Sequence, residues 1–135
     1  MSLNDILFRY TSSGASAATA AQDDLRAGVD ASHQMAMTDL PRLKKYSADF
    51  LAVGQKHGLP PALLAAISSR ETRGGGRLNK SGYGSNGADF GLMQVNKDSH
   101  KLVGSAFSRE HIDQAAGILK KFHLAVKKKH PSWPP

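Results

Sequence analysis

The chain has 135 residues, 40% of them hydrophobic, which allows one folded domain with one modest core and argues against disorder. Its formal charge of +7 favours anionic partners such as nucleic acid, anionic membranes or acidic cell walls, without choosing among them. The chain contains no cysteine, so disulfides are excluded and the redox compartment stays open.

Neither a membrane span nor a secretory signal is apparent. No apolar run approaches the roughly 20 residues that cross a bilayer, and residues 1–20 lack a basic region followed by an apolar stretch. Those residues are rich in Ser, Thr and small side chains, and we expect a loosely ordered arm there. A single domain is expected over residues 21–135. Its first helix is predicted at about Ala21–Met37, although Gly28 and Asp30 weaken the pattern.

A stronger second helix is predicted from Asp39 to His57. Asp39 can serve as its N-cap, Pro41 is tolerated in the first turn, and Gly58 is a natural C-terminal stop. The apolar residues recur at helical spacing and predict one buried face: Leu40, Leu43, Tyr46, Phe50 and Val53.

The third helix is predicted to begin at Pro60-Pro61 and carries an acid in an unusual place. At about 3.6 residues per turn, Glu71 falls on the apolar face formed by Leu63, Leu64 and Ile67. Burial and the partial negative charge of a helix C-terminal end would both favour the protonated carboxyl, which is the form a general acid needs. The alternative is a structural role, in which Glu71 points outward or pairs with Arg70, Arg73 or Arg77.

A glycine-rich segment follows the third helix: Gly74, Gly75, Gly76, Gly82, Gly84, Gly87 and Gly91. Such a segment allows tight turns or a close approach of the backbone to a ligand. Its interleaved apolar residues argue against a flexible linker and favour short strands beside a cleft: Tyr83, Phe90, Leu92, Met93 and Val95.

After a loop at Lys97–Ala106, Ser108 is a candidate N-cap for a fourth helix ending near His130, before Pro131. Its predicted inner face consists of Ile112, Ala115, Ala116, Leu119, Phe122 and Val126. Its lysines lie largely outside that face and indicate either attraction to an anionic partner or a solvated helix surface: Lys120, Lys121, Lys127, Lys128 and Lys129.

Several motifs, in this order and spacing, resemble those of goose-type lysozymes: AAISSRET (65–72), GYG (82–84), FGLMQV (90–95) and SHK (99–101). A weaker likeness extends back to about Asp39 and forward to HPSW (130–133). The chain is similar to the cysteine-free form found in fish. The resemblance implies an α-rich α+β, lysozyme-like fold, a helical bundle with a small irregular β segment.

By this resemblance, Glu71 is the acid that protonates the glycosidic oxygen between amino sugars of peptidoglycan. An inverting mechanism also needs a base, with the two carboxyl groups roughly 6.5–9.5 Å apart. Where the family has Asp, this chain has Ser85 and Asn96, and neither is a base of comparable strength. Asp89, in the same glycine-rich loop, could substitute. Its alternative role is that of a turn residue binding local backbone N–H groups.

Three further residues match family positions that line the sugar cleft: Tyr83, Gln94 and His100. Tyr83 can stack on a sugar face, while Gln94 and His100 can form hydrogen bonds. As alternatives, Tyr83 could pack in the core and His100 could cap a loop. The other histidines lack the clustering of metal ligands, so we expect no metal and no cofactor.

The family domain continues past HPSW with more helices and a Tyr-Asn motif that is absent here, so the C-terminal helices are predicted to be missing. We therefore expect a peptidoglycan glycoside hydrolase that cleaves between N-acetylmuramic acid and N-acetylglucosamine in antibacterial defence, with weakened or lost activity. It would act as a monomer on bacterial glycan, without a nucleic-acid partner. The resemblance implies an extracellular protein, whereas the lack of a signal leaves a cytoplasmic location or non-classical export open.

Two other functions compete with this one. The first is a non-catalytic remnant that binds peptidoglycan, favoured by Ser85, Asn96 and the missing Tyr-Asn motif. The second is a basic protein that binds membranes or nucleic acid, supported only by the lysine-rich helix near Lys120–Lys129.

Overall fold

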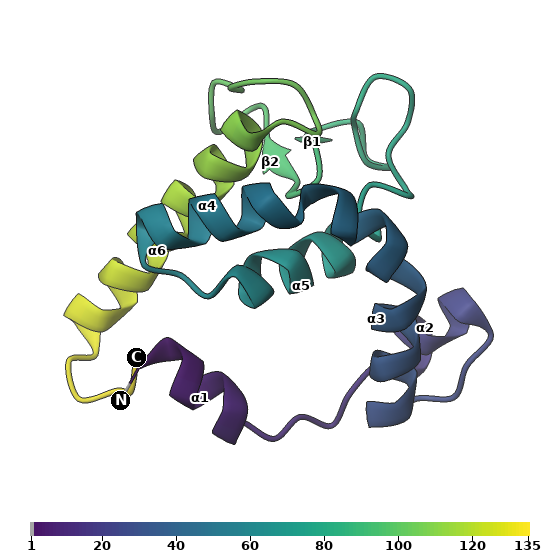
Figure 1. Cartoon of the computed structure of the whole chain (residues 1–135), viewed down its shortest axis with the longest axis horizontal. Coiled ribbons are helices and arrows are strands. Elements are labelled where there is room, and N and C mark those ends of the chain that lie inside the picture. Colours follow the sequence, from purple (N-terminus) through teal and green to yellow (C-terminus); the bar gives the residue numbers. More distant parts are fainter. Residues whose placement is uncertain (1) are drawn as a thin grey trace.

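The structure is a computed structural model that describes residues 2–135. It is an α-rich α+β fold, as expected, with helices α4, α5 and α6 packed together and a small antiparallel hairpin above one end of them (Figure 1). In chain order the helices and strands are α1 Leu3–Arg9, α2 Ala17–Ala20, η1 Ala21–Asp23, α3 Val29–Leu43, η2 Lys44–Tyr46, α4 Ser47–His57, α5 Pro61–Thr72, β1 Asp89–Phe90, β2 Val95–Asn96 and α6 Arg109–Lys129. Within residues 2–135 no helix is both long and apolar enough to cross a membrane.

The core lies where α4, α5 and α6 meet beneath the hairpin. Leu64 of α5, Leu92 of the hairpin and Ile112 of α6 are each 0% exposed. Phe50 and Val53 of α4 complete the centre of this cluster. Burying each of these side chains contributes about 1.5–3 kcal/mol to stability. Because the cluster contains residues of the hairpin and of the helices, it holds the hairpin against them.

Helices occur in the segment that was expected to be a loosely ordered arm. Ser2 caps α1 with a capping box to Asp5, and Ser16 caps α2 by accepting from the backbone N–H of Thr19. Ala15 forms an isolated antiparallel bridge with Gly28, which ties this segment to the start of α3. Ser2 and Ser16 therefore act here as helix caps.

The boundary predicted at Asp39 is wrong, because Asp39 lies inside α3 rather than at a helix start. A short 3-10 turn and then α4, beginning at Ser47, follow the end of α3 at Leu43. The Asp39 carboxylate is 0% exposed and bonds to side chains, not to the next helix's N–H groups. Pro41 sits within α3, so the Met37 carbonyl lacks its i+4 donor, at a position where the Met37 side chain is exposed.

The predicted turn between the second and third helices is confirmed. Gly58 ends α4 in the left-handed conformation, with φ 66°, and Pro61 is the first residue of α5. Gly54 allows the helices to approach, since a Cβ there would lie 2.6 Å from the Leu59 carbonyl oxygen. This tight turn places α5 antiparallel to α4 (Figure 1). The C-terminal end of α5 contacts the segment between β1 and β2 through Thr72 and Leu92.

Ser108 caps α6 as predicted, by accepting from the backbone N–H of His111. Ile112 and Ala116 face the core, which confirms the first half of the predicted inner face. Phe122 and Val126, expected on the same face, are exposed. The second half of α6 therefore extends beyond the core that its first half covers.

Candidate active site

The last residue of α5 ties that helix to the hairpin. Thr72 Oγ1 donates to the Leu92 carbonyl oxygen at 3.0 Å and accepts from the Gly75 N–H at 2.9 Å. Arg73 then takes a left-handed φ of 57° and ends the helix. The final turn of α5, which carries Glu71, is thus fixed against the segment between the two strands.

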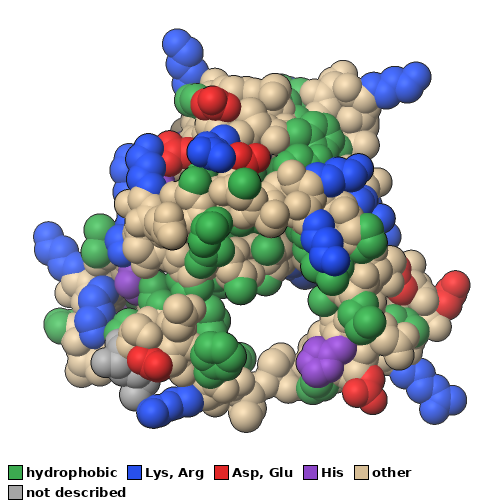
Figure 2. All heavy atoms as spheres, in the orientation of Figure 1, with side chains coloured by type: hydrophobic (Ala, Val, Ile, Leu, Met, Phe, Trp, Pro, Cys, Tyr) green, Lys and Arg blue, Asp and Glu red, His purple; other side chains and the backbone are tan. Residues whose placement is uncertain are grey.

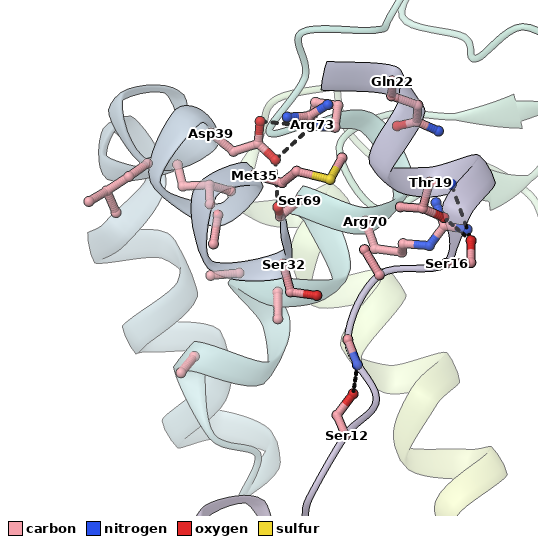
Figure 3. Close-up of a pocket in the computed structure, with 18 residues that line it drawn as sticks. Ser12, Ser16, Thr19, Gln22, Ser32, Met35, Asp39, Ser69, Arg70 and Arg73 are labelled. Carbon is pink, nitrogen blue, oxygen red and sulfur yellow. Dashed lines mark hydrogen bonds and ion pairs between the residues drawn. The ribbon is translucent and has the colours of Figure 1, made fainter. Parts of the chain in front are cut away.

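A buried ionic network holds the same helix end from the other side. Arg73 Nε lies 2.9 Å from both carboxylate oxygens of Asp39, and its two terminal nitrogens bind Asp23 at 2.8 and 2.6 Å. Ser69 donates to Asp39 at 2.6 Å, and Arg42 donates to Asp39 at 2.7 Å and to the Arg73 carbonyl at 2.6 Å. Figure 3 shows Asp39, Ser69 and Arg73 converging.

The charges in this network stabilise one another. Asp23 and then Asp39 raise the pKa of Arg73 by accepting its hydrogen bonds, and Arg73 lowers the pKa of Asp23. A buried guanidinium paired with two carboxylates is a fully bonded arrangement, and removing one partner would leave a buried charge uncompensated. None of these ion pairs was predicted from the sequence.

Glu71 is exposed, so the prediction that it is shielded is wrong. The buried stripe of α5 runs through Leu64, Ser68 and Thr72, one residue away from the predicted one, and Ile67 is only half-buried. Within the described residues the Glu71 carboxylate forms no hydrogen bond or ion pair, so the alternative pairing with a neighbouring arginine does not occur either. The carboxylate is therefore free at the helix end.

Asp89 lies on β1 directly opposite Asn96 of β2. Its Oδ1 accepts from Asn96 Nδ2 at 2.9 Å, and its Oδ2 accepts from Asn86 Nδ2 at 2.8 Å. The local backbone N–H groups of Ala88 and Asp89 are bound by Asn86 Oδ1. The turn role considered for Asp89 is thus filled by Asn86, and Asp89 is a half-buried carboxylate held by two amides. Ser85, on the same loop, is exposed.

Gln94 stabilises the inside of the hairpin. It has a left-handed φ of 55°, and its Nε2 donates to the carbonyls of Gly91 at 3.0 Å and Asp89 at 3.2 Å. Gly84 packs against this side chain so closely that a Cβ there would lie 2.3 Å from Gln94 Oε1. The amide nitrogen of Gln94 is already used by the protein, and its predicted role in sugar binding stays a prediction.

The remaining predicted cleft residues flank the hairpin. The Tyr83 ring meets Phe90 edge-on at 5.0 Å between centroids, and Lys97 Nζ lies 5.5 Å from the Tyr83 centroid. His100 is half-buried, and its backbone N–H bonds to the Asn96 carbonyl. The hairpin therefore gathers Tyr83, Asp89 and Gln94 closely, with His100 on the loop just beyond β2.

His111, which the sequence pattern did not single out, fixes the hairpin to α6. Its Nε2 accepts from the Met93 N–H at 3.0 Å, and a Cβ on Gly91 would lie 2.4 Å from that nitrogen. The ring is 0% exposed, and burial lowers the pKa of His111 to about 4. A neutral imidazole with Nε2 as acceptor is therefore the form that holds the hairpin in place.

A cavity of about 680 Å³ lies between the N-terminal segment, α3 and α5 (Figures 2 and 3). It is mostly apolar, and none of the predicted site residues lines it. Its acidic residue, Asp39, is already bound to arginines. Across residues 2–135, no group of three or more acidic or histidine side chains is placed to hold a metal. The exposed end of α5 with the hairpin is thus the better candidate for acid–base chemistry.

Comparison with known proteins gives a consistent match. The family model described as Lysozyme g matches residues 5–135. Lysozyme g of Cyprinus carpio is 44% identical over 126 residues, covering 93% of this chain and 68% of the relative. Lysozyme g of Struthio camelus is 41% identical over 126 residues, covering 93% of this chain and 61% of the relative.

Lysozyme g-like protein 2 of Homo sapiens is also similar, with 41% identity over 109 residues, or 81% of this chain. The chain spans about half the length of this relative, with 51% of it covered.

Proposed function

The chain belongs to the lysozyme g family, and from that premise we propose that it acts on bacterial peptidoglycan as a glycoside hydrolase. The bond cleaved would be the β-1,4 linkage between N-acetylmuramic acid and N-acetylglucosamine, in extracellular antibacterial defence. The observation that carries the proposal is the Thr72–Leu92 hydrogen bond. It joins the helix end that bears Glu71 to the hairpin that bears Asp89.

In this proposal Glu71 is the general acid. Its carboxyl is exposed and has no partner in residues 2–135, so it is accessible to a glycosidic oxygen. Ser69, which donates to Asp39, and Thr72, which donates to Leu92, restrain the helix on either side of Glu71. That restraint supplies orientation, which a proton transfer to the leaving group requires.

Asp89 is proposed as the base that orients the attacking water. Asn96 occupies a position where the resemblance implies Asp, and its Nδ2 donates to Asp89 across the ladder at 2.9 Å. This pair of register partners therefore still contains a carboxylate, but it lies on β1 instead of β2. Two amide donors, from Asn86 and Asn96, hold the two oxygens of this carboxylate in position.

Tyr83, Gln94 and His100 are proposed to form the floor of the sugar site. Tyr83 is half-exposed and can stack on a sugar face, with Lys97 beside it. Gln94 contributes by holding the hairpin's shape, since its Nε2 already binds backbone carbonyls. His100 has its side chain half-buried on the adjoining loop.

The exposure of Glu71 favours a second function, a protein that binds peptidoglycan without cleaving it. A general acid works best when water is excluded around it, and residues 2–135 do not cover Glu71. Binding needs only the hairpin surface, which is intact.

Cell-wall turbidity and glycan pull-down, measured together, test both functions. Glu71→Gln should abolish clearance and keep glycan retention, because it removes the transferable proton and little else. Asp89→Asn should lower clearance by a factor on the order of 10². Equal clearance by the native chain and Glu71→Gln would reject Glu71 as the acid. Retention without any clearance by the native chain would select the binding function.

A further inference from the structure

The loop between α5 and β1 contains the single Asn-X-Ser/Thr sequence of the chain, Asn79-Lys80-Ser81. Such a sequence is an acceptor for N-linked glycosylation when its middle residue is not proline and it lies in a surface loop of an exported protein. Asn79, Lys80 and Ser81 are all exposed. Figure 1 shows the loop beyond the C-terminal end of α5, away from both chain ends. The loop is therefore a suitable place for an acceptor.

Asn79 forms a tight turn with the residues that follow it. Its Oδ1 accepts from the backbone N–H of Ser81 at 2.9 Å and from that of Tyr83 at 3.0 Å. Its own N–H donates to the Tyr83 carbonyl at 2.8 Å, and its carbonyl accepts from the Gly82 N–H at 3.0 Å. An Asn side chain bonded to the backbone two residues further on is an Asx turn. The asparagine and the hydroxyl residue of the acceptor sequence are therefore held together in one defined turn.

The side-chain nitrogen of Asn79 is not used by this turn. An Asn amide has one acceptor oxygen and one NH₂ group, and the two N–H donors identify the oxygen. Across residues 2–135, Asn79 Nδ2 forms no hydrogen bond. By contrast, Nδ2 of Asn86 and Nδ2 of Asn96 each donate to Asp89. Of these three side chains, Asn79 is the one whose nitrogen is accessible for a new bond.

Ser81 is held through its backbone and not through its hydroxyl. Its N–H binds Asn79, whereas its Oγ takes part in no hydrogen bond in the described part of the chain. A hydroxyl two residues after the asparagine is what distinguishes an acceptor sequence from any other asparagine. Removing this hydroxyl should therefore destroy the acceptor sequence and leave the turn intact.

We propose that Asn79 is an acceptor for an N-linked oligosaccharide. The modification takes place in a eukaryotic secretory pathway, and so it rests on the extracellular location of the proposed function. The donor is an oligosaccharide joined through N-acetylglucosamine to a lipid diphosphate. Asn79 Nδ2 attacks C1 of that sugar, the bond between C1 and the diphosphate oxygen breaks, and its electron pair leaves with the lipid diphosphate. The amide proton passes to a base of the transferase, so one C–N bond replaces one C–O bond.

The folded chain can carry this oligosaccharide without losing the turn. The new bond uses Nδ2 and leaves Oδ1 as the acceptor for the N–H groups of Ser81 and Tyr83. Because Asn79 is exposed in a surface loop, the bulky polar group stays in solvent. The glycosylated and unglycosylated chains should therefore have the same fold.

Gel electrophoresis and mass spectrometry test this site directly. The full chain is expressed behind a cleavable secretory signal in vertebrate cells and collected from the medium. The expected result is a form of higher mass that peptide N-glycosidase F reduces to the polypeptide alone, with Asn79 alone converted to aspartate. A secreted chain without added mass would overturn the proposal, and so would added mass that survives the glycosidase.

Matched serine substitutions separate the acceptor sequence from a general effect on the surface. Ser81→Ala should lose the higher-mass form completely, and Ser81→Thr should keep it, because threonine also supplies the hydroxyl. Ser99→Ala is the control and should keep it too. Ser99 is likewise exposed and its N–H likewise binds an Asn Oδ1, but that residue, Asn96, lies three positions earlier. A higher-mass form that persists in Ser81→Ala, or that is lost equally in Ser99→Ala, would overturn the proposal.

Folding and glycan cleavage are controlled separately. Circular dichroism verifies that Ser81→Ala and Ser99→Ala fold alike. Glu71→Gln should carry the same oligosaccharide as the native chain, because the transferase does not use Glu71. A missing higher-mass form would therefore count against Asn79 as the acceptor, whereas missing cell-wall clearance would count against the proposed hydrolysis.

Discussion

Acidification should destabilise the protein through one buried histidine. His111 accepts a hydrogen bond from Met93 N–H while it is neutral, and burial lowers its pKa to about 4, against an ordinary 6.5. In the unfolded chain His111 takes up a proton as the pH falls below 6.5, while in the folded chain it resists until about pH 4. The stabilisation is therefore complete above pH 6.5 and is lost as the pH falls between those values.

The size of the effect follows from the shift. One pKa unit corresponds to about 1.4 kcal/mol, so the free energy of unfolding should fall by about 2 kcal/mol between pH 7 and pH 5. By pH 4 the loss should be about 3 kcal/mol. Arg73 lowers the pKa of Asp23 below its ordinary 3.8. Protonation of Asp23 therefore reduces the free energy of unfolding only at a pH below that value. The window from pH 7 to pH 5 therefore separates the effect of His111 from that of Asp23.

Urea denaturation at pH 7, 6 and 5 measures this loss for the native chain and for His111→Phe. The variant should be less stable at pH 7 by about 1–3 kcal/mol, because the buried Met93 N–H loses its acceptor. It should also lose most of the pH dependence. His33→Gln, at an exposed site, is the control and should keep the native slope. An equal slope for the native chain and His111→Phe would refute the assignment of this pH dependence to His111.

Two further substitutions test the restraints on the α5 end and the hairpin, each by urea denaturation at pH 7. Asp39→Asn should lower the free energy of unfolding by about 3 kcal/mol, because the buried Arg73 charge loses a partner. The exposed Asp30→Asn is its control, and equal losses would show that the network is not stabilising. Gly91→Ala should cost more than Gly87→Ala, although both have positive φ, at 78° and 71°. Only Gly91 has the buried imidazole against it, so equal costs would contradict that contact.

Local signals predicted the helices around the core well. Proline at the start of α5, glycine at the end of α4 and serine before α6 act through backbone groups a few residues away. Their effects can therefore be predicted from residues that are close in the sequence. The α-rich fold with a small β hairpin followed from these and from the family motifs.

Long-range partners explain the errors. Asp39 has the residue type and spacing of an N-cap, but its partner Arg73 lies 34 residues further along the chain. His111 accepts a hydrogen bond from a backbone N–H of the hairpin. No motif of side chains in the sequence predicts such a contact. The face of α5 was misplaced by one residue because periodicity defines a stripe without showing which neighbours cover it. Glu71 lies at the edge of that stripe and is exposed as a result.

The Asp89–Asn96 pair offers the sharpest test of the proposed chemistry. These residues are register partners, and such side chains have Cβ atoms about 4.5–5.5 Å apart. The double variant Asp89→Asn with Asn96→Asp reverses the cross-strand hydrogen bond and restores the acid at the position the family resemblance implies. If a carboxylate at this rung orients the attacking water, Asp89→Asn alone should lose about 10²-fold of the hydrolysis, and the double variant should recover most of that loss. Cell-wall clearance measures both. A double variant as slow as the single one would show that the cleavage does not depend on a carboxylate at this rung, and Asp89 would no longer be a candidate base.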